Sequence, residues 1–343
     1  MESFRKGLKR LAGRSEVSVL LAVILLGLLF SVFSANFLSS YNIYNLSRTA
    51  ALYIFIALSQ TCVILVGGMN LSVGYIGGMT VVASGYMMQN MGAGILAAVI
   101  GGLVVGVLAG LLNGLVITKL KINSFVVTLA TSFFFKGLVT GVSEGFPYTV
   151  LAPGFTTLGR GMFLGLPYML YLVILVLAAV WYLFGYTVIG RKLLATGGNL
   201  QAAKMAAINT DSTIIIANVL SGLFAAVAGL CSVSMNGSAQ PTTGGDWMVY
   251  SFAVSVIGGT ALAGGAISAV GLFIAAFLIV MIKNGLVMIN ANIYYEQTYL
   301  GLILLVAVSL SSISGFLSRR RQRRQFLMEQ RQRSAEQMPQ GIE

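Results

Sequence analysis

Long apolar runs with few charged residues dominate the sequence and limit what it can fold into. They lie at about 17–37, 48–66, 71–89, 94–118, 125–142, 166–187, 212–235, 250–264, 267–289 and 296–316. Several are close to the roughly 20 residues that a helix needs to cross a bilayer. The strands of a membrane β-barrel would instead alternate apolar and polar residues. The pattern predicts an all-α integral membrane protein with about ten transmembrane helices.

The composition supports a lipid environment and excludes several functions. Only 9% of the 343 residues are charged, whereas soluble domains contain roughly 25%. The net charge of +12 would indicate nucleic-acid binding in a soluble protein, but these basic residues flank apolar runs, where they set topology. The chain has no His, and Cys62 and Cys231 lie inside apolar runs. We therefore expect no nucleic-acid partner, metal site, cofactor or disulfide.

The distribution of Lys and Arg predicts the orientation of the chain. If the N-terminus is cytoplasmic, ten spans place Lys119, Lys121 and both basic termini inside the cell. Arg48 and Arg160 then lie outside, in agreement with the positive-inside rule. Both termini are therefore expected in the cytoplasm. The predicted organisation is a basic N-terminus at 1–16, a transmembrane domain at 17–316 and a basic tail at 317–343.

The stretch "GGLVVGVLAGLLNG" places a glycine at every fourth position of one run. The four glycines are Gly102, Gly106, Gly110 and Gly114. This spacing aligns them along one face of a helix, and small residues there let another helix approach closely. We expect this face to be a site of tight helix packing.

A second glycine-rich stretch, "VGGMNLSVGYIGGM" at Val66–Met79, interrupts a run with polar residues. Its glycines disfavour a continuous helix, since each costs about 1 kcal/mol relative to alanine. Non-helical backbone at membrane depth is tolerated only where protein or water satisfies it, and broken helices often line a solute path. The stretch is therefore either a broken or re-entrant path-lining segment or a tight bend between two helices.

A third stretch, "GGTALAGG" at Gly258–Gly265, resembles the glycine spacing of a phosphate-binding loop. Ala266 and Ile267 follow it, where such a loop requires Lys and Ser or Thr. The stretch is therefore not an ATP site. We expect no enzymatic activity from this chain, and any ATP that drives it would be bound by another subunit.

The polar segment Gly190–Asp211, part of a loop predicted at 188–211, lies between two apolar runs. Asn199 can cap a helix from Leu200 to Ile208, which would be roughly 14 Å long and too short to cross a bilayer. One face of this helix carries small or apolar residues, namely Leu200, Ala203, Ala207 and Ile208. Such a helix suits docking into a groove of a partner protein, or resting on lipid as an interfacial helix.

This segment resembles the cytoplasmic coupling loop of permeases from ABC importers of the ribose-permease type, whose pattern is "GR…A.GGN..AA…GIN". The matching residues are Gly190, Arg191, Ala195, Gly197, Gly198, Asn199, Ala202, Ala203, Ile208 and Asn209. The two glycine-rich stretches resemble the family's "GG.DLSVG" and "GGT.L.GG", and the likeness covers roughly 40–316. The chain departs from the family at Asn70 (usually Asp), Ala207 (usually Gly), Ala266 and Ile267 (usually Arg-Gly), and Lys283 (commonly Asn).

The resemblance implies the permease subunit of an ATP-dependent importer for a small pentose- or hexose-type sugar. It implies two ATPase subunits or one fused ATPase, a second permease subunit in a homodimer or heterodimer, and an extracytoplasmic sugar-binding protein. It places the chain in a bacterial inner membrane. The residues that would couple the chain to the ATPase are Gly198, Asn199, Leu200, Ala203, Lys204, Ala207 and Ile208.

A sugar path needs hydrogen-bonding side chains within the spans. The candidates are Gln60, Asn70, Ser72, Asn113, Asn218 and Asn236, although such residues also join helices to one another. The alternative function is an ion-coupled secondary transporter of a small polar solute, which usually needs carboxylates inside the membrane. The nine acidic residues instead fall at ends and loops. The sequence leaves the sugar and the roles of Lys136 and Lys283 open.

Overall fold

The computed structural model describes residues 15–289, together with 292, 295, 297–299, 301, 302 and 305. The chain divides into two compact units, Met1–Ala291 and Asn292–Glu343. The helices discussed below belong to the first unit. Most of the predicted N-terminus 1–16, most of the predicted span 296–316 and all of the tail 317–343 lie outside the described residues.

Each of the first nine predicted runs corresponds to a helix. These helices are α2 (Ser15–Phe33), α3 (Ser40–Ile64), α4 (Val73–Gln89), α5 (Ile95–Lys119), α6 (Ser124–Ser143), α8 (Tyr168–Tyr186), α11 (Thr210–Asn236), α12 (Trp247–Ile257) and α13 (Ala269–Met288). Among the described residues, 7 helices are long and apolar enough to cross a membrane. The shorter two are α4, with 17 residues, and α12, with 11. A predominantly helical membrane protein is confirmed, and the number of ten spans stays a prediction.

Short elements connect the long helices. They are α7 (Thr157–Arg160), α9 (Val188–Gly198), α10 (Leu200–Met205), β1 (Met162–Phe163) and β2 (Leu166–Pro167). The two strands form an antiparallel hairpin in which Met162 pairs with Pro167. The hairpin leads into α8, whereas α9 and α10 connect α8 to α11.

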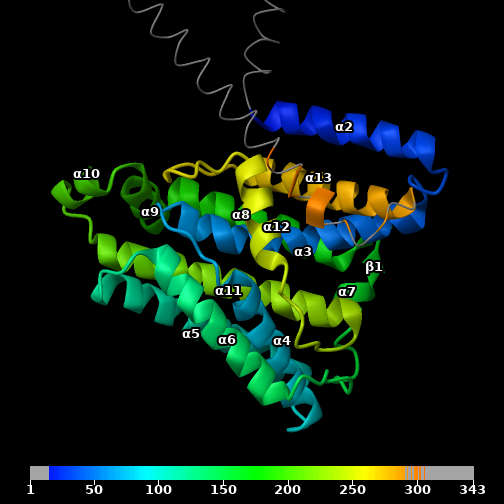
Figure 1. The fold of residues 1–343 in the computed structure, drawn as a ribbon, viewed down its shortest axis with the longest axis horizontal. Helices are drawn as coiled ribbons and strands as arrows, with labels where there is room; N and C mark the ends of the chain where they lie inside the picture. Colours follow the sequence, from blue (N-terminus) through cyan, green and yellow to red (C-terminus); the bar gives the residue numbers. More distant parts are fainter. Residues whose placement is uncertain are drawn as a thin grey trace, which may run out of the picture. The chain divides into compact units, whose positions relative to one another are not determined.

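Helix α11 lies among the other long helices, with α3, α4 and α5 packed against it (Figure 1). Helix α3 extends this core toward α12 and α13. In the most apolar stretch of 18 residues of α3, 89% of the residues are buried, whereas in the corresponding stretch of α2 only 6% are. Large apolar side chains such as Leu25 and Phe33 of α2 are exposed, as expected for a helix that faces lipid tails.

The four regularly spaced glycines of α5 lie where α5 contacts α11 and α4. A Cβ on Gly106 would come within 2.6 Å of the Gly222 carbonyl oxygen, and one on Gly110 would overlap the Asn218 carbonyl. A Cβ on Gly114 would lie 2.9 Å from Ile215 Cα, and one on Gly102 would lie 3.0 Å from Thr80 Cγ2. The backbones of α5 and α11 therefore approach closely at Gly106, Gly110 and Gly114.

The stretch Val66–Met79 contains a short connection followed by a helix. The backbone N–H of Gly67 donates to Ile64, and that of Gly68 donates to Val63, so the chain turns directly after α3. The remaining glycines lie inside α4, where side chains on Gly74 and Gly77 would overlap Gly244 and Trp247. The non-helical part is thus limited to residues 65–72, and close packing accounts for the later glycines.

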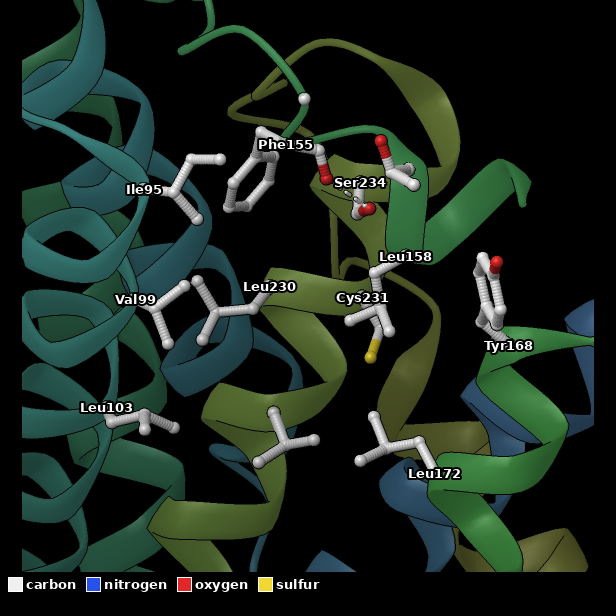
Figure 2. A pocket seen from close by; sticks show the side chains of 13 residues that line it. Ile95, Val99, Leu103, Phe155, Leu158, Tyr168, Leu172, Leu230, Cys231 and Ser234 are labelled. Atoms are coloured by element: carbon white, nitrogen blue, oxygen red, sulfur yellow. Dashed lines mark hydrogen bonds between the residues drawn. The ribbon is translucent and has the colours of Figure 1, made fainter. Parts of the chain in front are cut away.

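An apolar cavity of about 550 Å³ lies between α5, α8 and α11 (Figure 2). Val99, Leu172 and Leu230 point into it, one from each helix. Ser234 also lines the cavity, but its hydroxyl donates to the Phe155 carbonyl at 2.7 Å. The walls therefore offer little hydrogen bonding to a sugar.

Candidate functional site: the coupling segment, the glycine junction and the buried network

The segment from Val188 to Met205, called the coupling segment below, begins with a sharp turn after α8. Thr187 Oγ1 donates to the Leu183 carbonyl at 2.6 Å and accepts from the Gly190 N–H at 3.1 Å. One side chain therefore ends α8 and caps α9. A side chain on Gly190 would overlap the Leu183 carbonyl, so the turn requires glycine at this position.

Helix α9 was missed in the sequence, where a helix was expected only from Leu200 onward. Its buried residues, Gly190, Leu193 and Thr196, are spaced three apart along one helix face. Together with the Thr187 cap, this spacing is the signal that was available. The coupling segment thus consists of two short helices rather than a loop with one.

Helix α10 begins as predicted, because Asn199 Oδ1 accepts from the Ala202 N–H at 3.0 Å. It ends at Met205, so the predicted extension to Ile208 is wrong. Ala207 has a left-handed φ of 57°, and the Ile208 N–H donates to the Ala203 carbonyl at 3.0 Å. This is the Schellman arrangement that ends helices, usually with glycine at the left-handed position.

The exposed surface of α10 differs from the predicted docking face. Ala203 is only 4% exposed, so it packs inside the chain and is not accessible to a partner. Leu200, Lys204 and Ala207 are exposed, and Met205 is 89% exposed. Met205 did not belong to the predicted face, although a methionine in a polar loop is a signal for a protein contact.

Three segments that are far apart in the sequence meet at a point that we call the glycine junction, formed by Leu65, Gly197, Gly264 and Gly265. A Cβ on Gly197 would overlap the Leu65 carbonyl oxygen and lie 2.7 Å from the Gly265 nitrogen. The Gly265 N–H donates to the Leu65 carbonyl at 3.0 Å. Gly264 and Gly265 have φ values of 92° and 78°, which favour glycine. Here the backbone of α9 contacts the backbone of the α3–α4 connection and that of the α12–α13 connection.

Beyond Leu65, the α3–α4 connection leads to a network of buried polar side chains centred on Asn70. Asn70 Nδ2 donates to Ser221 Oγ at 2.9 Å, and Asn70 Oδ1 accepts from Ser72 Oγ at 2.7 Å. Asn113 Nδ2 donates to Ser72 Oγ at 2.9 Å. All four side chains are 0% exposed. The network joins α5 and α11 to the connection between α3 and α4.

Helix α3 completes this network with two neighbouring residues. Ser59 Oγ donates to the Ser221 carbonyl at 2.8 Å. The Gln60 amide donates to the Asn70 carbonyl at 2.7 Å and accepts from the Asn70 N–H at 3.3 Å. We call Ser59, Gln60, Asn70, Ser72, Asn113 and Ser221 the buried network. Because Asn70 both donates and accepts, it fits this site without burying a carboxylate charge.

A family model described as "Branched-chain amino acid transport system / permease component" matches residues 42–308 of the chain. The chain belongs to this permease family. The ribose import permease protein RbsC of Bacillus subtilis (strain 168) is 37% identical over 292 residues, which cover 84% of this chain and 90% of the relative. RbsC of Escherichia coli (strain K12) is 31% identical over 298 residues, 85% of this chain and 92% of the relative.

A relative named for another substrate matches over a similar length. The autoinducer 2 import system permease protein LsrC of Yersinia pseudotuberculosis serotype O:3 (strain YPIII) is 32% identical over 298 residues. These cover 87% of this chain and 85% of the relative. No solved structure matches the chain. The family assignment therefore agrees with the resemblance seen in the sequence.

The permease brings together four of the six residues predicted to line a solute path, which are Gln60, Asn70, Ser72 and Asn113. Asn218 lies on α11 one turn before Ser221 and donates to the Ile214 carbonyl at 2.9 Å. Asn236 ends the same helix, and its carbonyl accepts from Arg160 Nη2 at 2.7 Å. Asn236 is therefore far along α11 from the others.

The two lysines whose roles the sequence left open have different surroundings. Lys283 Nζ on α13 donates to Tyr250 Oη at 3.2 Å and to Tyr53 Oη at 3.4 Å. The two tyrosine rings stack with centroids 4.8 Å apart. Lys136 on α6 is exposed and lies 5.9 Å from the centroid of the Tyr75 ring. Lys283 is thus held by polar groups from α3 and α12.

Proposed function

We propose that the permease forms the membrane path of an ATP-dependent importer for a small pentose- or hexose-type sugar. An extracytoplasmic binding protein delivers the sugar, and two ATPase subunits or one fused ATPase supply the energy. The glycine junction carries this proposal, because it connects the short helix α9 to the α3–α4 connection, which leads to the buried network, and to the α12–α13 connection. Relatives named for the import of ribose and autoinducer 2 support the solute class.

The coupling segment is the part that an ATPase subunit would hold. Met205, Leu200 and Lys204 are exposed on α10, while Asn199 and Ala207 fix the two ends of this helix. A methionine surrounded by polar residues suits a contact in the groove of a partner protein. Movement of the ATPase would displace α10 and α9 together.

Such a displacement would reach the buried network through the glycine junction. Gly197 touches the Leu65 backbone, and no side chain is present there to move aside and absorb the motion. Leu65 belongs to the connection that carries Asn70. A shift of this connection would change the hydrogen bonds among Asn70, Ser72 and Asn113, whose groups would then bind the hydroxyls of a sugar.

Asn218 adds to this polar surface. Asn113 Oδ1 and Asn218 Oδ1 are buried without a hydrogen-bond partner among the described residues. An unsatisfied buried acceptor costs about 1–3 kcal/mol, which a hydroxyl donor would recover. We propose Gln60, Asn70, Ser72, Asn113 and Asn218 as the polar lining of the path.

The alternative, an ion-coupled transporter, is less consistent with the described helices. In the part of the chain that the structure describes, carboxylates occur only at helix ends or next to them: Glu16, Glu144, Asp211 and Asp246. Ion-coupled transporters usually place carboxylates near the middle of the membrane. The ATP-driven importer is therefore the function that we propose.

The test is reconstitution of the permease with its ATPase and binding protein in liposomes. Ribose is the first solute to try, and both ATP hydrolysis and ribose uptake are measured. We expect the ribose-loaded binding protein to stimulate ATP hydrolysis and ATP to drive uptake. Accumulation of a solute by the permease alone, with only an ion gradient, would overturn the proposal in favour of secondary transport.

A further inference from the structure

A second cavity, of about 310 Å³, lies between the end of α8, Leu194 of α9 and residues 265–269 at the start of α13. Its walls are mainly apolar and include Trp181, Phe184, Gly185, Leu194, Ala266 and Ile267. A Cβ on Gly185 would meet no atom within 4 Å, so the cavity has room at this position. We call it the α8–α9 cavity.

Aromatic side chains around the α8–α9 cavity place it at the surface of the bilayer. Trp181, Tyr182 and Tyr186 are 60%, 61% and 58% exposed at the end of a membrane-spanning helix. Their rings contact one another, with Trp181 and Tyr182 centroids 5.1 and 5.7 Å from that of Tyr186. Exposed Trp and Tyr at the end of a spanning helix are typical of the membrane–water interface.

Helix α9 continues this interface with apolar and basic residues. Val188 and Ile189 are exposed apolar residues, and Arg191 and Lys192 follow them, also exposed. Within the described part of the chain, neither basic side chain has an ion pair or hydrogen bond. Arg191 lies one turn before Leu194, which lines the cavity. A short helix with this composition binds membrane surfaces, with its cations on anionic headgroups.

We propose that the α8–α9 cavity, together with the exposed Arg191 and Lys192 of α9, forms a binding site for an anionic phospholipid. One acyl chain occupies the cavity, and the phosphate binds Arg191 and Lys192. The larger cavity of Figure 2 lacks this combination, because the nearby Arg160 already donates to the carbonyls of Met235 and Asn236. A bound lipid would hold α9 in position. The site does not depend on which solute the permease moves.

The test uses the full chain purified in detergent and native mass spectrometry with defined lipids. Phosphatidylglycerol is compared with phosphatidylcholine of the same acyl chains, and with glycerol phosphate, which has no acyl chain. The charge variant is Arg191→Gln with Lys192→Gln, and its matched control is Lys119→Gln with Lys121→Gln, since both pairs are exposed. The cavity variant is Gly185→Leu. Its control is Gly137→Leu, another helical glycine with no atom within 4 Å of a Cβ.

We expect the chain to retain phosphatidylglycerol more strongly than phosphatidylcholine. In the charge variant, the ratio of the affinity for phosphatidylglycerol to that for phosphatidylcholine should fall roughly 30-fold. This corresponds to about 2 kcal/mol at about 1.4 kcal/mol per factor of ten. The cavity variant should weaken binding of both lipids, and both controls should bind as the unmodified chain does. Equal retention of the two lipids, equal losses in variant and control, or binding of glycerol phosphate as strong as that of phosphatidylglycerol would each overturn the inference.

Discussion

At Gly197 the lack of a side chain is a structural requirement, because the backbone of another segment occupies the space. A Cβ there would overlap the Leu65 carbonyl oxygen, and neither backbone can rotate away as a side chain would. The neighbouring Gly198 has no atom within 4 Å of a Cβ. The two glycines are adjacent in sequence, but only at Gly198 is there space for a side chain.

Gly197→Ala should therefore separate α9 from the α3–α4 connection. Overpacking at a close contact costs about 1–3 kcal/mol, so we expect ATP-driven uptake by the reconstituted importer to fall roughly tenfold or more. Gly137→Ala, at a glycine of α6 with no atom within 4 Å of a Cβ, is the control and should transport at a rate near that of the unmodified chain. Equal uptake by the two variants would contradict a role for the glycine junction in coupling.

A second residue-scale prediction concerns Ala207, which ends α10 in the left-handed conformation. Alanine is strained there and glycine is not, so Ala207→Gly should stabilise the end of α10 by about 0.5–1 kcal/mol after the entropy cost of glycine. The amide of Ile208, which bonds to Ala203, should then exchange its hydrogen roughly 2–5 times more slowly. Ala206→Gly, at a position with a φ of −82°, should not slow the exchange.

Residues whose roles depend on nearby sequence were predictable, and those that depend on distant contacts were not. The Asn199 cap acts over three residues, so its pattern is visible in the sequence. Ser221 joins the buried network through Ser59, which is 162 positions away, and only the packing of α3 against α11 brings them together. For the same reason, the sequence did not indicate that Ala203 is buried.

At the scale of elements, the coupling segment is two helices that meet at Asn199. Asn199 has φ and ψ of −160° and 106°, so one extended residue separates α9 from α10. Helix α9 was missed because its apolar positions are few and glycines occupy both of its ends. Its burial against α8 and α11, rather than helix propensity, supports it, as is common for short helices.

Helix α10 should bind the ATPase through its exposed end. Met205→Glu would place a charge in an apolar contact, and we expect recovery of the ATPase with the tagged permease to fall roughly tenfold or more. Met91→Glu is the control, because Met91 is also exposed, at 66%, but lies in the connection between α4 and α5. If the Met205 variant retains the ATPase fully, α10 is not the docking element.

At the scale of the whole molecule, the apolar runs were sufficient to predict the helices but not their packing. The run at 250–264 was interpreted as a span, yet α12 ends at Ile257. The glycines that follow it contact Gly197 and Gly198 instead. Hydropathy reports only how apolar a segment is, so it does not distinguish a spanning helix from a short helix followed by a turn.

The orientation of the permease is open to a direct test, because its two natural cysteines do not interfere. Cys62 and Cys231 are each 2% exposed, so a membrane-impermeant maleimide should not reach them. In intact cells, Met91→Cys should react from outside, whereas Lys204→Cys should react only after the membrane is opened, since positive charge favours the cytoplasmic side. Reaction of Lys204→Cys in intact cells would place α10 away from any cytoplasmic ATPase. The proposed coupling would then be wrong, even if the helices themselves are correct.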